Sequence, residues 1–337
     1  MLFRSVVVGD SLSQAVAAGA DVRVPLYASF LTDGKTWGDS LTLSAQLYGW
    51  DALGRRRSYL ETTRRVPYHP WMTGPLEPLP VTMPAGPAVL VLAVRLEDGA
   101  GTVLHRNFCT FVVEGEPSPE VRLDDGRRAR LVSIDPARFD SAAWSLKQWN
   151  VMDGLKVNGA GSGFFEYHVA WPAGIALADL DSAVFVAEVS SKQLFGKDRA
   201  GSGRIEGDFM RGRGTLDPSL NPNAYPMTDE RLYPSAVTVR INGVVAGRAA
   251  LADDPADHRG ILSWHYQKHD RRLREAGSYG TLLRVAVPRD ALERAAGLGQ
   301  LLIRLEVDAE LPGGLAIYGR RFGRYPLDPT VIFLLRR

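Results

Sequence analysis

The sequence contains a single cysteine, Cys109, among its 337 residues, so no disulfide can form within the chain. Cys109 lies in HRNFCTFVVEG, a stretch that is typical of a β-strand. A small apolar side chain buried in a strand is therefore the role that we expect for it. A single cysteine does not distinguish a reducing from an oxidising cellular compartment.

Long hydrophobic runs are also lacking. No apolar segment approaches the length that is needed to cross a membrane, so we expect no membrane partner. The first residues, MLFRSVVVGDSL, contain no hydrophobic signal segment and enter a strand-like run almost at once. From this abrupt start we expect that Met1 stands inside a longer protein.

Neither sign of charge is in excess, since 40 basic and 38 acidic residues give a net charge of +2. Proteins that bind nucleic acid usually show a strong basic excess or a basic stripe. The richest basic stretch here, RRLR at 271–274, is typical of a solvated face. We therefore expect no nucleic-acid partner.

Helical signals are few. The clearest is DALERAAG, where Asp290 and Glu293 have the spacing of a capping box and Gly297 would end the helix. HYQKHDRRLREAG, at 265–277, predicts a second short helix. Two such helices do not make an α/β fold.

Alternation with a period of two residues dominates instead, and it predicts an all-β chain. In LTLSAQLYGW (41–50) the apolar residues Leu41, Leu43, Ala45 and Leu47 share one face, and Thr42, Ser44, Gln46 and Tyr48 share the other. FFEYHVAW (164–171) and LLIRLEV (301–307) alternate in the same way. Turn sequences separate the runs, at TDG (32–34), DGAG (98–101), DDG (124–126) and ING (241–243).

The stretch EGEPSPE at 114–120 has the composition of a short, stiff linker. It divides the chain into residues 1–117, which have the size and strand number of an immunoglobulin-like β-sandwich, and residues 118–337, which predict a jelly-roll β-sandwich. The second domain contains a long irregular stretch at 192–235. Loops of that length inside a compact domain are usually functional or mobile.

Residues 251–270, LADDPADHRGILSWHYQKHD, are the richest in groups that could bind a metal. His265 and His269 have the spacing of two zinc ligands on one helix face, but Tyr266 stands where a metalloprotease motif has glutamate. Surface histidines beside a strand are the simpler interpretation. A loop with Asp253, Asp254 and Asp257 offers oxygen ligands to Ca²⁺, although it lacks the full calcium-loop spacing.

Motifs for catalysis are incomplete. GAGSGF at 159–164 has Phe164 where the nucleophile motif G-x-S-x-G needs glycine, and no phosphate-binding loop occurs. The glycines of GAGSGF are better explained as turn residues. No pair of carboxylates stands out as catalytic, so we assign no catalytic residue.

The aromatic residues indicate a binding function. Several of them lie where we expect loops, namely Trp37, Trp144, Trp149, Tyr225 and Tyr233. Exposed rings can stack on the apolar faces of sugars while neighbouring polar groups bind the hydroxyls. Each tryptophan is nonetheless more often a core residue than a binding platform, and Trp50 and Trp171, at strand ends, are the best core candidates.

Several strings resemble the C-terminal region of glycoside hydrolase family 2, the β-galactosidase-like enzymes. In the second domain they are GGLAIYGRRFGRYPLDPTVIF (313–333), VTVRINGVV (237–245), DDPADHRGILSWHYQ (253–267) and GAGSGFFEYHV (159–169). In the first domain VPLYASF (24–30) and LYGWDALGR (47–55) resemble the immunoglobulin-like sandwich that follows the catalytic barrel. The barrel itself has no counterpart here, so the resemblance transfers no catalytic residue.

The resemblance implies that the second domain is a galactose-binding-like jelly roll, a fold that often binds carbohydrate and often holds a structural Ca²⁺. We expect a non-catalytic carbohydrate-binding fragment of a secreted or periplasmic enzyme, with the parent catalytic domain as a further partner. Because the longest loop is 192–235, we place the sugar at the loop end, on Trp149, Tyr225, Tyr233, Asp257, His258 and Arg259. The alternative is a purely structural pair of sandwiches that braces the barrel or mediates oligomerisation, and it predicts an apolar patch on one outer face.

Overall fold

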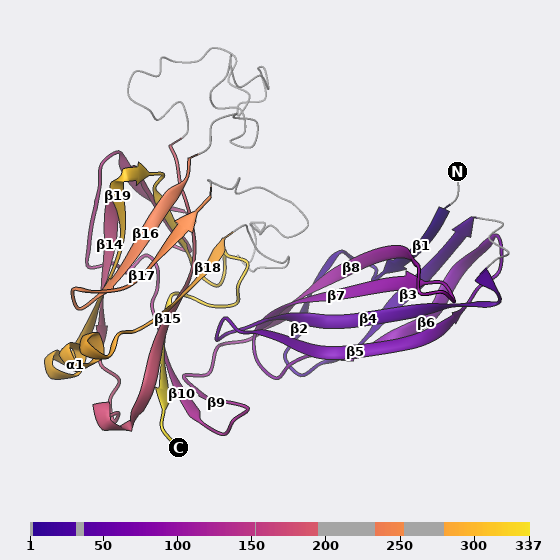
Figure 1. Ribbon diagram of the computed structural model, residues 1–337, viewed down its shortest axis with the longest axis horizontal. Coiled ribbons are helices and arrows are strands. Elements are labelled where there is room, and N and C mark those ends of the chain that lie inside the picture. Colours follow the sequence, from indigo (N-terminus) through magenta and orange to yellow (C-terminus); the bar gives the residue numbers. More distant parts are fainter. Residues whose placement is uncertain (1–2, 32–36, 152, 195–232, 253–279) are drawn as a thin grey trace, which may run out of the picture. The chain divides into compact units, whose positions relative to one another are not determined.

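The structure is a computed structural model that describes residues 3–31, 37–151, 153–194, 233–252 and 280–337 (Figure 1). Their regular structure is almost entirely β-strand, with one α-helix, α1 (Arg289–Leu298), and one short 3-10 helix, η2 (Leu177–Asp179), in the described ranges. The all-β fold predicted from the alternation is confirmed. None of the described helices is long and apolar enough to span a membrane.

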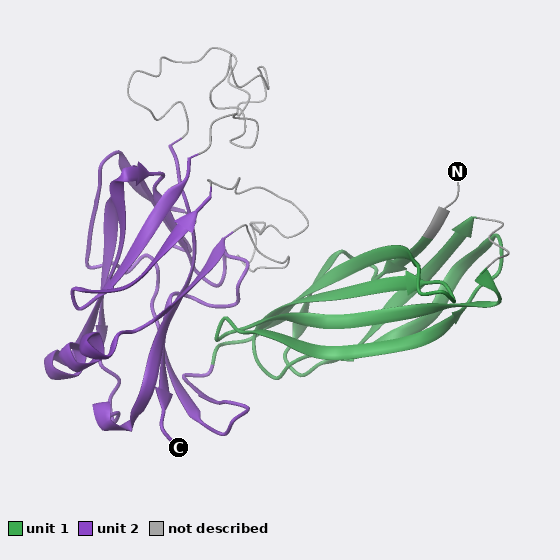
Figure 2. Cartoon of the chain, viewed as in Figure 1, with its two compact units in different colours: residues 1–117, 259–277 green, residues 118–258, 278–337 purple. Residues whose placement is uncertain are grey.

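The described residues form two compact units (Figure 2), unit 1 up to Pro117 and unit 2 from Ser118. Unit 1 consists of two β-sheets. The three-stranded sheet has the order β1 (Phe3–Val8), β3 (Asp21–Leu31), β6 (Met72–Thr82). The five-stranded sheet has the order β2 (Ser13–Ala17), β8 (Val103–Glu114), β7 (Ala88–Glu97), β4 (Ser40–Asp51), β5 (Arg56–Pro67).

The core of unit 1 lies between these two sheets. In β4 the buried residues Leu41, Leu43, Ala45 and Leu47 belong to this core, as their alternation predicts. Cys109 of β8 is fully buried there, and burial raises the pKa of its thiol to about 12. It is the small core residue that its position in the sequence predicts.

The N-terminal strands of unit 1 pass from one sheet to the other. β1 is antiparallel to β3, whereas β2 runs parallel to β8. Side chains of β8 bind the backbone of Val6 in β1: its N–H donates to Nδ1 of His105 at 3.3 Å, and its C=O accepts from Nδ2 of Asn107 at 2.9 Å. These bonds satisfy backbone groups that an edge strand would otherwise expose.

Unit 2 is a second pair of sheets. One has the order β11 (Ser141–Trp144), β14 (Gly163–Ala170), β19 (Gln300–Pro312), β16 (Ser235–Ile241), β17 (Val244–Leu251). The other has the order β12 (Lys147–Val151), β13 (Lys156–Ala160), β20 (Leu315–Tyr318), β15 (Leu180–Ser190), β21 (Thr330–Leu335), β10 (Arg128–Ser133), β9 (Glu120–Arg122), with β18 (Thr281–Ala286) beside β15.

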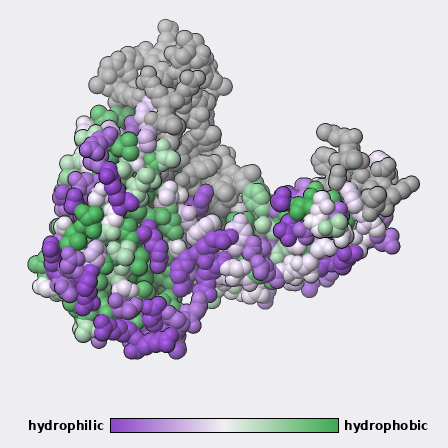
Figure 3. Space-filling view, viewed as in Figure 1, coloured by the Kyte–Doolittle hydropathy of each residue, from purple (hydrophilic) through white to green (hydrophobic). Residues whose placement is uncertain are grey.

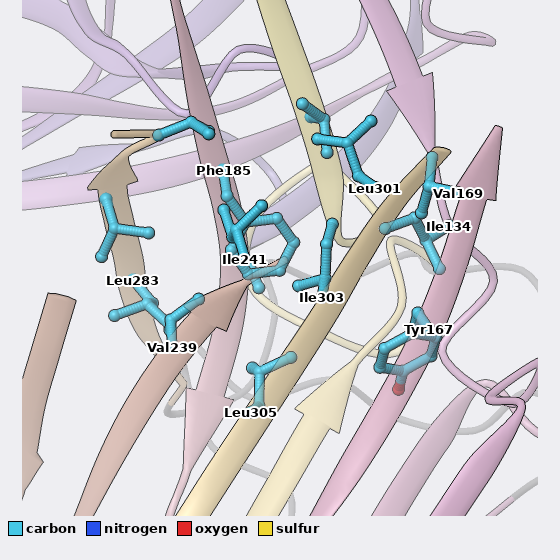
Figure 4. Packing of buried hydrophobic residues seen from close by; sticks show 14 of the residues in the cluster. Ile134, Tyr167, Val169, Phe185, Val239, Ile241, Leu283, Leu301, Ile303 and Leu305 are labelled. Carbon is cyan, nitrogen blue, oxygen red and sulfur yellow. The ribbon is translucent and has the colours of Figure 1, made fainter. Parts of the chain in front are cut away.

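Residues from both sheets form the core of unit 2 (Figure 4). Tyr167 of β14 and Ile303 of β19 come from one sheet, and Phe185 of β15 comes from the other. The buried hydroxyl of Tyr167 donates to the carbonyl oxygen of Pro136 at 2.9 Å. The alternation of FFEYHVAW and LLIRLEV therefore predicted the inward faces of β14 and β19 correctly.

The ends of helix α1 differ from the prediction. Pro288 precedes its first residue, and Asp290 lies inside the first turn without capping the helix. Proline is well suited to a helix start because its fixed φ is close to helical and the first N–H groups have no partner within the helix. The helix passes Gly297 and ends at Gly299, which adopts a left-handed φ of 71°.

The predicted turn at 241–243 is a two-residue connection in which Asn242 and Gly243 both have positive φ, of 48° and 81°. Such a turn suits the twist of a β-hairpin. The turns at 98–101 and 124–126 also lie between strands. The turn at 32–34 and the second predicted helix lie outside the described residues.

Candidate functional site

The outer face of the five-stranded sheet of unit 1 contains a groove of about 1020 Å³. We call it the sheet-face groove. The residues that line it include Ser44, Gln46, Tyr48, Glu61, Thr63, Ala93, Arg95, Arg106 and Phe108. Ligand pockets generally enclose about 300–1,000 Å³, so the groove is large enough for an oligosaccharide.

Strand register explains how these residues meet. Gln46 of β4 lies directly opposite Glu61 of β5 and Ala93 of β7, and Ala93 lies opposite Phe108 of β8. Directly opposed residues of an antiparallel sheet point to the same face. The small Ala93 therefore lies between the Gln46–Glu61 pair and the ring of Phe108. Its short side chain forms the floor of the groove.

The next positions along the strands add a second aromatic ring. Tyr48 lies opposite Val91, and the guanidinium carbon of Arg56 is 4.6 Å from the centroid of the Tyr48 ring. This cation–π contact holds the half-buried ring of Tyr48 in place. Beyond it, Trp50 packs on the buried Val89 and Val112 and forms an apolar end of the sheet face.

Polar groups on the same face can bind hydroxyls. Nε2 of Gln46 donates to Oε1 of Glu61 at 2.9 Å, and Oγ1 of Thr63 donates to Oγ of Ser44 at 3.4 Å. The first bond fixes the orientation of the amide and leaves its oxygen pointing away from the carboxylate. Amide, carboxylate and hydroxyl groups beside two aromatic rings are the combination that recognises a sugar.

Glu61 supplies the one carboxylate among the described residues that line the groove. Hydrolysis of a glycoside usually requires two carboxyl groups, one as acid and one as base or nucleophile. The described lining of the sheet-face groove supplies one of these two groups.

Most of the sugar site predicted from the sequence belongs to segments outside the described residues. Tyr225, Asp257, His258 and Arg259 lie outside the described residues, as do Asp253 and Asp254 of the predicted calcium loop. Within the described ranges, no group of three or more His, Cys, Asp or Glu side chains could hold a metal ion. The predicted calcium site stays a prediction.

Trp149 and Tyr233 are the two members of that site that the structure describes. Trp149 lies within the edge strand β12, where a loop was expected, and it is half-buried. It faces Asn158 across the ladder, and with the Asn158 amide in the orientation that satisfies both of its groups, Nε1 of Trp149 donates to the amide oxygen at 3.0 Å. Tyr233, also half-buried, lies just before β16, with its backbone beside Gly313.

Three other tryptophans pack on aromatic residues, whereas Trp71 is exposed. The ring of Trp144, a residue of β11 and not of a loop, is 5.1 Å from that of Phe165, and Trp37 is 5.3 Å from Tyr68. Trp171 lies 5.5 Å from Phe333 of the unit 2 core, as expected. Trp37 does lie in the connection between β3 and β4, as predicted, but the rings of Trp37 and Trp144 both pack against the cores of their units.

The sequence did contain a signal for the sheet-face groove. The alternation of β4 places Thr42, Ser44, Gln46 and Tyr48 on one face, which is the face that the groove occupies. Over the face of each unit that Figure 3 shows, hydrophilic and hydrophobic residues are interspersed. Composition alone therefore does not mark the site.

Comparisons with known proteins do not place the chain in a family. No family model matches it, and no curated protein matches at a significant level. Among solved structures, tripeptidyl peptidase 2 aligns with 99% of this chain at 11% identity and a TM-score of 0.22, and the chain spans only 20% of that protein.

Two further structures align with most of the chain. A Paenibacillus cycloisomaltooligosaccharide glucanotransferase in complex with cycloisomaltoheptaose covers 93% of this chain and 72% of its own, at 6% identity and a TM-score of 0.24. A SusE-like protein covers 98% and 96%, at 9% identity and a TM-score of 0.20. Scores this low do not establish a common fold, so the function has to be argued from the site.

Proposed function

We propose that the chain is a non-catalytic carbohydrate-binding fragment of a glycoside hydrolase family 2-like enzyme, and that the sheet-face groove binds an oligosaccharide. The observation that carries the proposal is the combination of Tyr48 and Phe108 with the hydrogen-bonded pair Gln46–Glu61 in one groove. In this proposal unit 1 is the immunoglobulin-like domain and unit 2 is the jelly roll. The family assignment is supported by the sequence resemblance alone.

The binding should be weak. Each stacked aromatic ring contributes about 0.5–1.5 kcal/mol beyond its buried area, and hydrogen bonds to sugar hydroxyls replace bonds to water at a small net gain. A dissociation constant between about 1 μM and 1 mM follows. Structural Ca²⁺ on Asp253, Asp254 and Asp257 belongs to the same proposal, as does a parent enzyme outside the cytoplasm.

Affinity gel electrophoresis with a panel of soluble polysaccharides tests the proposal. Replacement of Tyr48 by alanine should abolish retardation of the chain, because it removes a stacking ring from the groove. The melting temperature should change little, since the half-buried Tyr48 lies on the outer face of the sheet, where its ring contacts the exposed Arg56.

Two variants serve as controls. Tyr27→Ala removes an exposed tyrosine from the other sheet of unit 1, and Trp149→Ala removes the ring that the sequence predicted as a platform. Both should leave retardation unchanged. Loss of retardation in Trp149→Ala but not in Tyr48→Ala would move the site to unit 2.

A second candidate function is structural. The outer face of the three-stranded sheet of unit 1 exposes Val7, Tyr27 and Leu31, which are 47%, 41% and 39% accessible. Val7 and Tyr27 lie directly opposite each other, so they form one apolar patch. Such a patch suits a face that braces another domain. If no polysaccharide retards the chain, this function takes the place of the first.

A further inference from the structure

We infer that the ligand of the sheet-face groove is acidic, and that its carboxylate or sulfate group binds between Arg95 and Arg106. This inference rests on the proposed function, because it names the class of sugar that the groove takes. It comes from the charged end of the groove, which the aromatic and amide groups do not explain.

Arg95 of β7 and Arg106 of β8 lie directly opposite each other. Both line the groove and both are exposed. Like charges that face each other across an antiparallel pair destabilise it. An anion between two guanidinium groups would turn this repulsion into attraction, and planar guanidinium groups bind carboxylate and sulfate oxygens through paired N–H donors.

The neighbouring acids neutralise only part of this charge. Nε of Arg95 is 2.8 Å from Oε1 of Glu97. This ion pair orients the arginine side chain through Nε and does not involve its two terminal NH₂ groups. Arg106 has no hydrogen bond or ion pair to a side chain in the part of the chain that the structure describes. Glu61 keeps its negative charge, but it lies on β5, which β4 separates from Arg95 on β7. The local field at this end of the groove is therefore positive.

The distances suit one acidic sugar within an oligosaccharide. Arg95 lies four positions along β7 from Val91, the residue opposite Tyr48. At ~3.4 Å per residue this corresponds to about 14 Å. One sugar unit can therefore place its acid group at Arg95 and Arg106 while another lies on the Tyr48 ring. A polyuronate or a sulfated polysaccharide carries sugar rings and acid groups along one chain, and so can occupy both places.

Polygalacturonate and its methyl ester make a matched pair of probes, because they share the sugar ring and differ in the charge. Affinity gels with the full chain should show retardation by the free acid at least ten-fold stronger than by the ester. Dextran sulfate distinguishes sulfate from carboxylate as the acid group, and either one supports an acidic ligand. Rising salt should weaken the binding, since the exposed charges are screened.

Arg106→Gln should reduce the affinity for the acidic polymer at least ten-fold. The matched control is Arg128→Gln, which removes one member of a second opposed arginine pair, Arg122 and Arg128 in unit 2, that has the same charge but no aromatic lining. Arg128→Gln should bind as the wild-type protein does. Equal losses in both variants would show unspecific attraction to charge and would overturn the inference.

The failure of this inference is distinct from failure of the proposed function. If the ester binds as strongly as the acid and Arg106→Gln has no effect, but Tyr48→Ala abolishes binding, the groove takes a neutral sugar and only the inference is wrong. If Tyr48→Ala binds every polymer as the wild type does, the groove is not the site and both are wrong.

Discussion

Replacement of Gly49 by alanine is expected to destabilise unit 1 by about 3 kcal/mol, at the upper end of the usual cost of overpacking. Gly49 lies in β4, next to Tyr48, and a Cβ atom there would stand 2.0 Å from the carbonyl oxygen of Val89 and 2.8 Å from Cα of Leu90. Both atoms belong to the backbone of β7, so neither can move aside without separating the two central strands beneath the sheet-face groove.

Gly99→Ala is the matched control, because a Cβ atom at Gly99 would meet no other atom within 4 Å. This variant should be as stable as the wild type or slightly more so, since alanine reduces the conformational freedom of the unfolded chain. Urea unfolding of the three proteins measures the difference. Equal midpoints for Gly49→Ala and Gly99→Ala would contradict the close strand approach.

The second large effect concerns Glu188, which is fully buried on β15. Its Oε1 accepts from the N–H of Arg324 at 2.9 Å, and its Oε2 accepts from the N–H of Tyr325 at 2.9 Å. Glycines at 280 and 323 allow the backbone to approach, since a Cβ atom at either position would lie within 2.2 Å of the Glu188 side chain. The carboxyl group thus anchors the loop 319–329 to the sheet.

Two charged residues in the described part of the chain lie near Glu188. Arg324 lies on the same loop, and Lys156 lies beyond Tyr318 in the same cross-strand row, with Nζ 4.4 Å from the Tyr318 ring centroid. Burial outweighs the N–H donors and Arg324, and it raises the pKa of Glu188 from 4.5 to about 7.

A pKa that is higher in the folded state makes stability fall with rising pH, because the unfolded chain loses the proton first. The wild-type protein should lose about 3 kcal/mol of unfolding free energy on this account as the pH rises from about 4.5 to about 7. Glu188→Gln should lack this loss. It should be less stable than wild type near pH 5, since an amide presents only one oxygen to the two N–H donors.

Urea unfolding at a series of pH values compares the two proteins. Asp328, whose pKa burial also raises, is present in both, so its contribution cancels in the difference. Parallel stability curves for wild type and Glu188→Gln would show that this carboxyl group does not titrate in the window.

Prediction from sequence succeeded where a strand has one buried face. Leu41 and Leu43 of β4, and Ile303 and Leu305 of β19, point inward as their alternation requires. Alternation does not describe β15, because both of its faces are buried. Val186, Glu188 and Ser190 lie on the outer face and are buried like the residues of the inner face. The loop 319–329 covers them, with Phe322 and Tyr325 buried, and no pattern within β15 indicates a loop that lies more than a hundred residues away.

The sheet-face groove was not predicted for a similar reason. Gln46 and Tyr48 could be assigned to one face of a strand, but Glu61, Ala93 and Phe108 join them only through strand pairing. The pairing places the small Ala93 between Gln46 and Phe108 and so creates the groove. Individual aromatic residues were a poorer guide, because Trp37 and Trp144 serve the cores of their units.

Hydroxyl-radical footprinting of the full chain, with and without a bound oligosaccharide, tests the location of the site most directly. Oxidation of Tyr48 and Phe108 should fall when the sugar binds, while oxidation of Tyr27 and Trp71, exposed elsewhere on unit 1, should stay constant and correct for scavenging by the sugar. Protection of Trp149 with Tyr48 and Phe108 unchanged would contradict a carbohydrate site in the sheet-face groove.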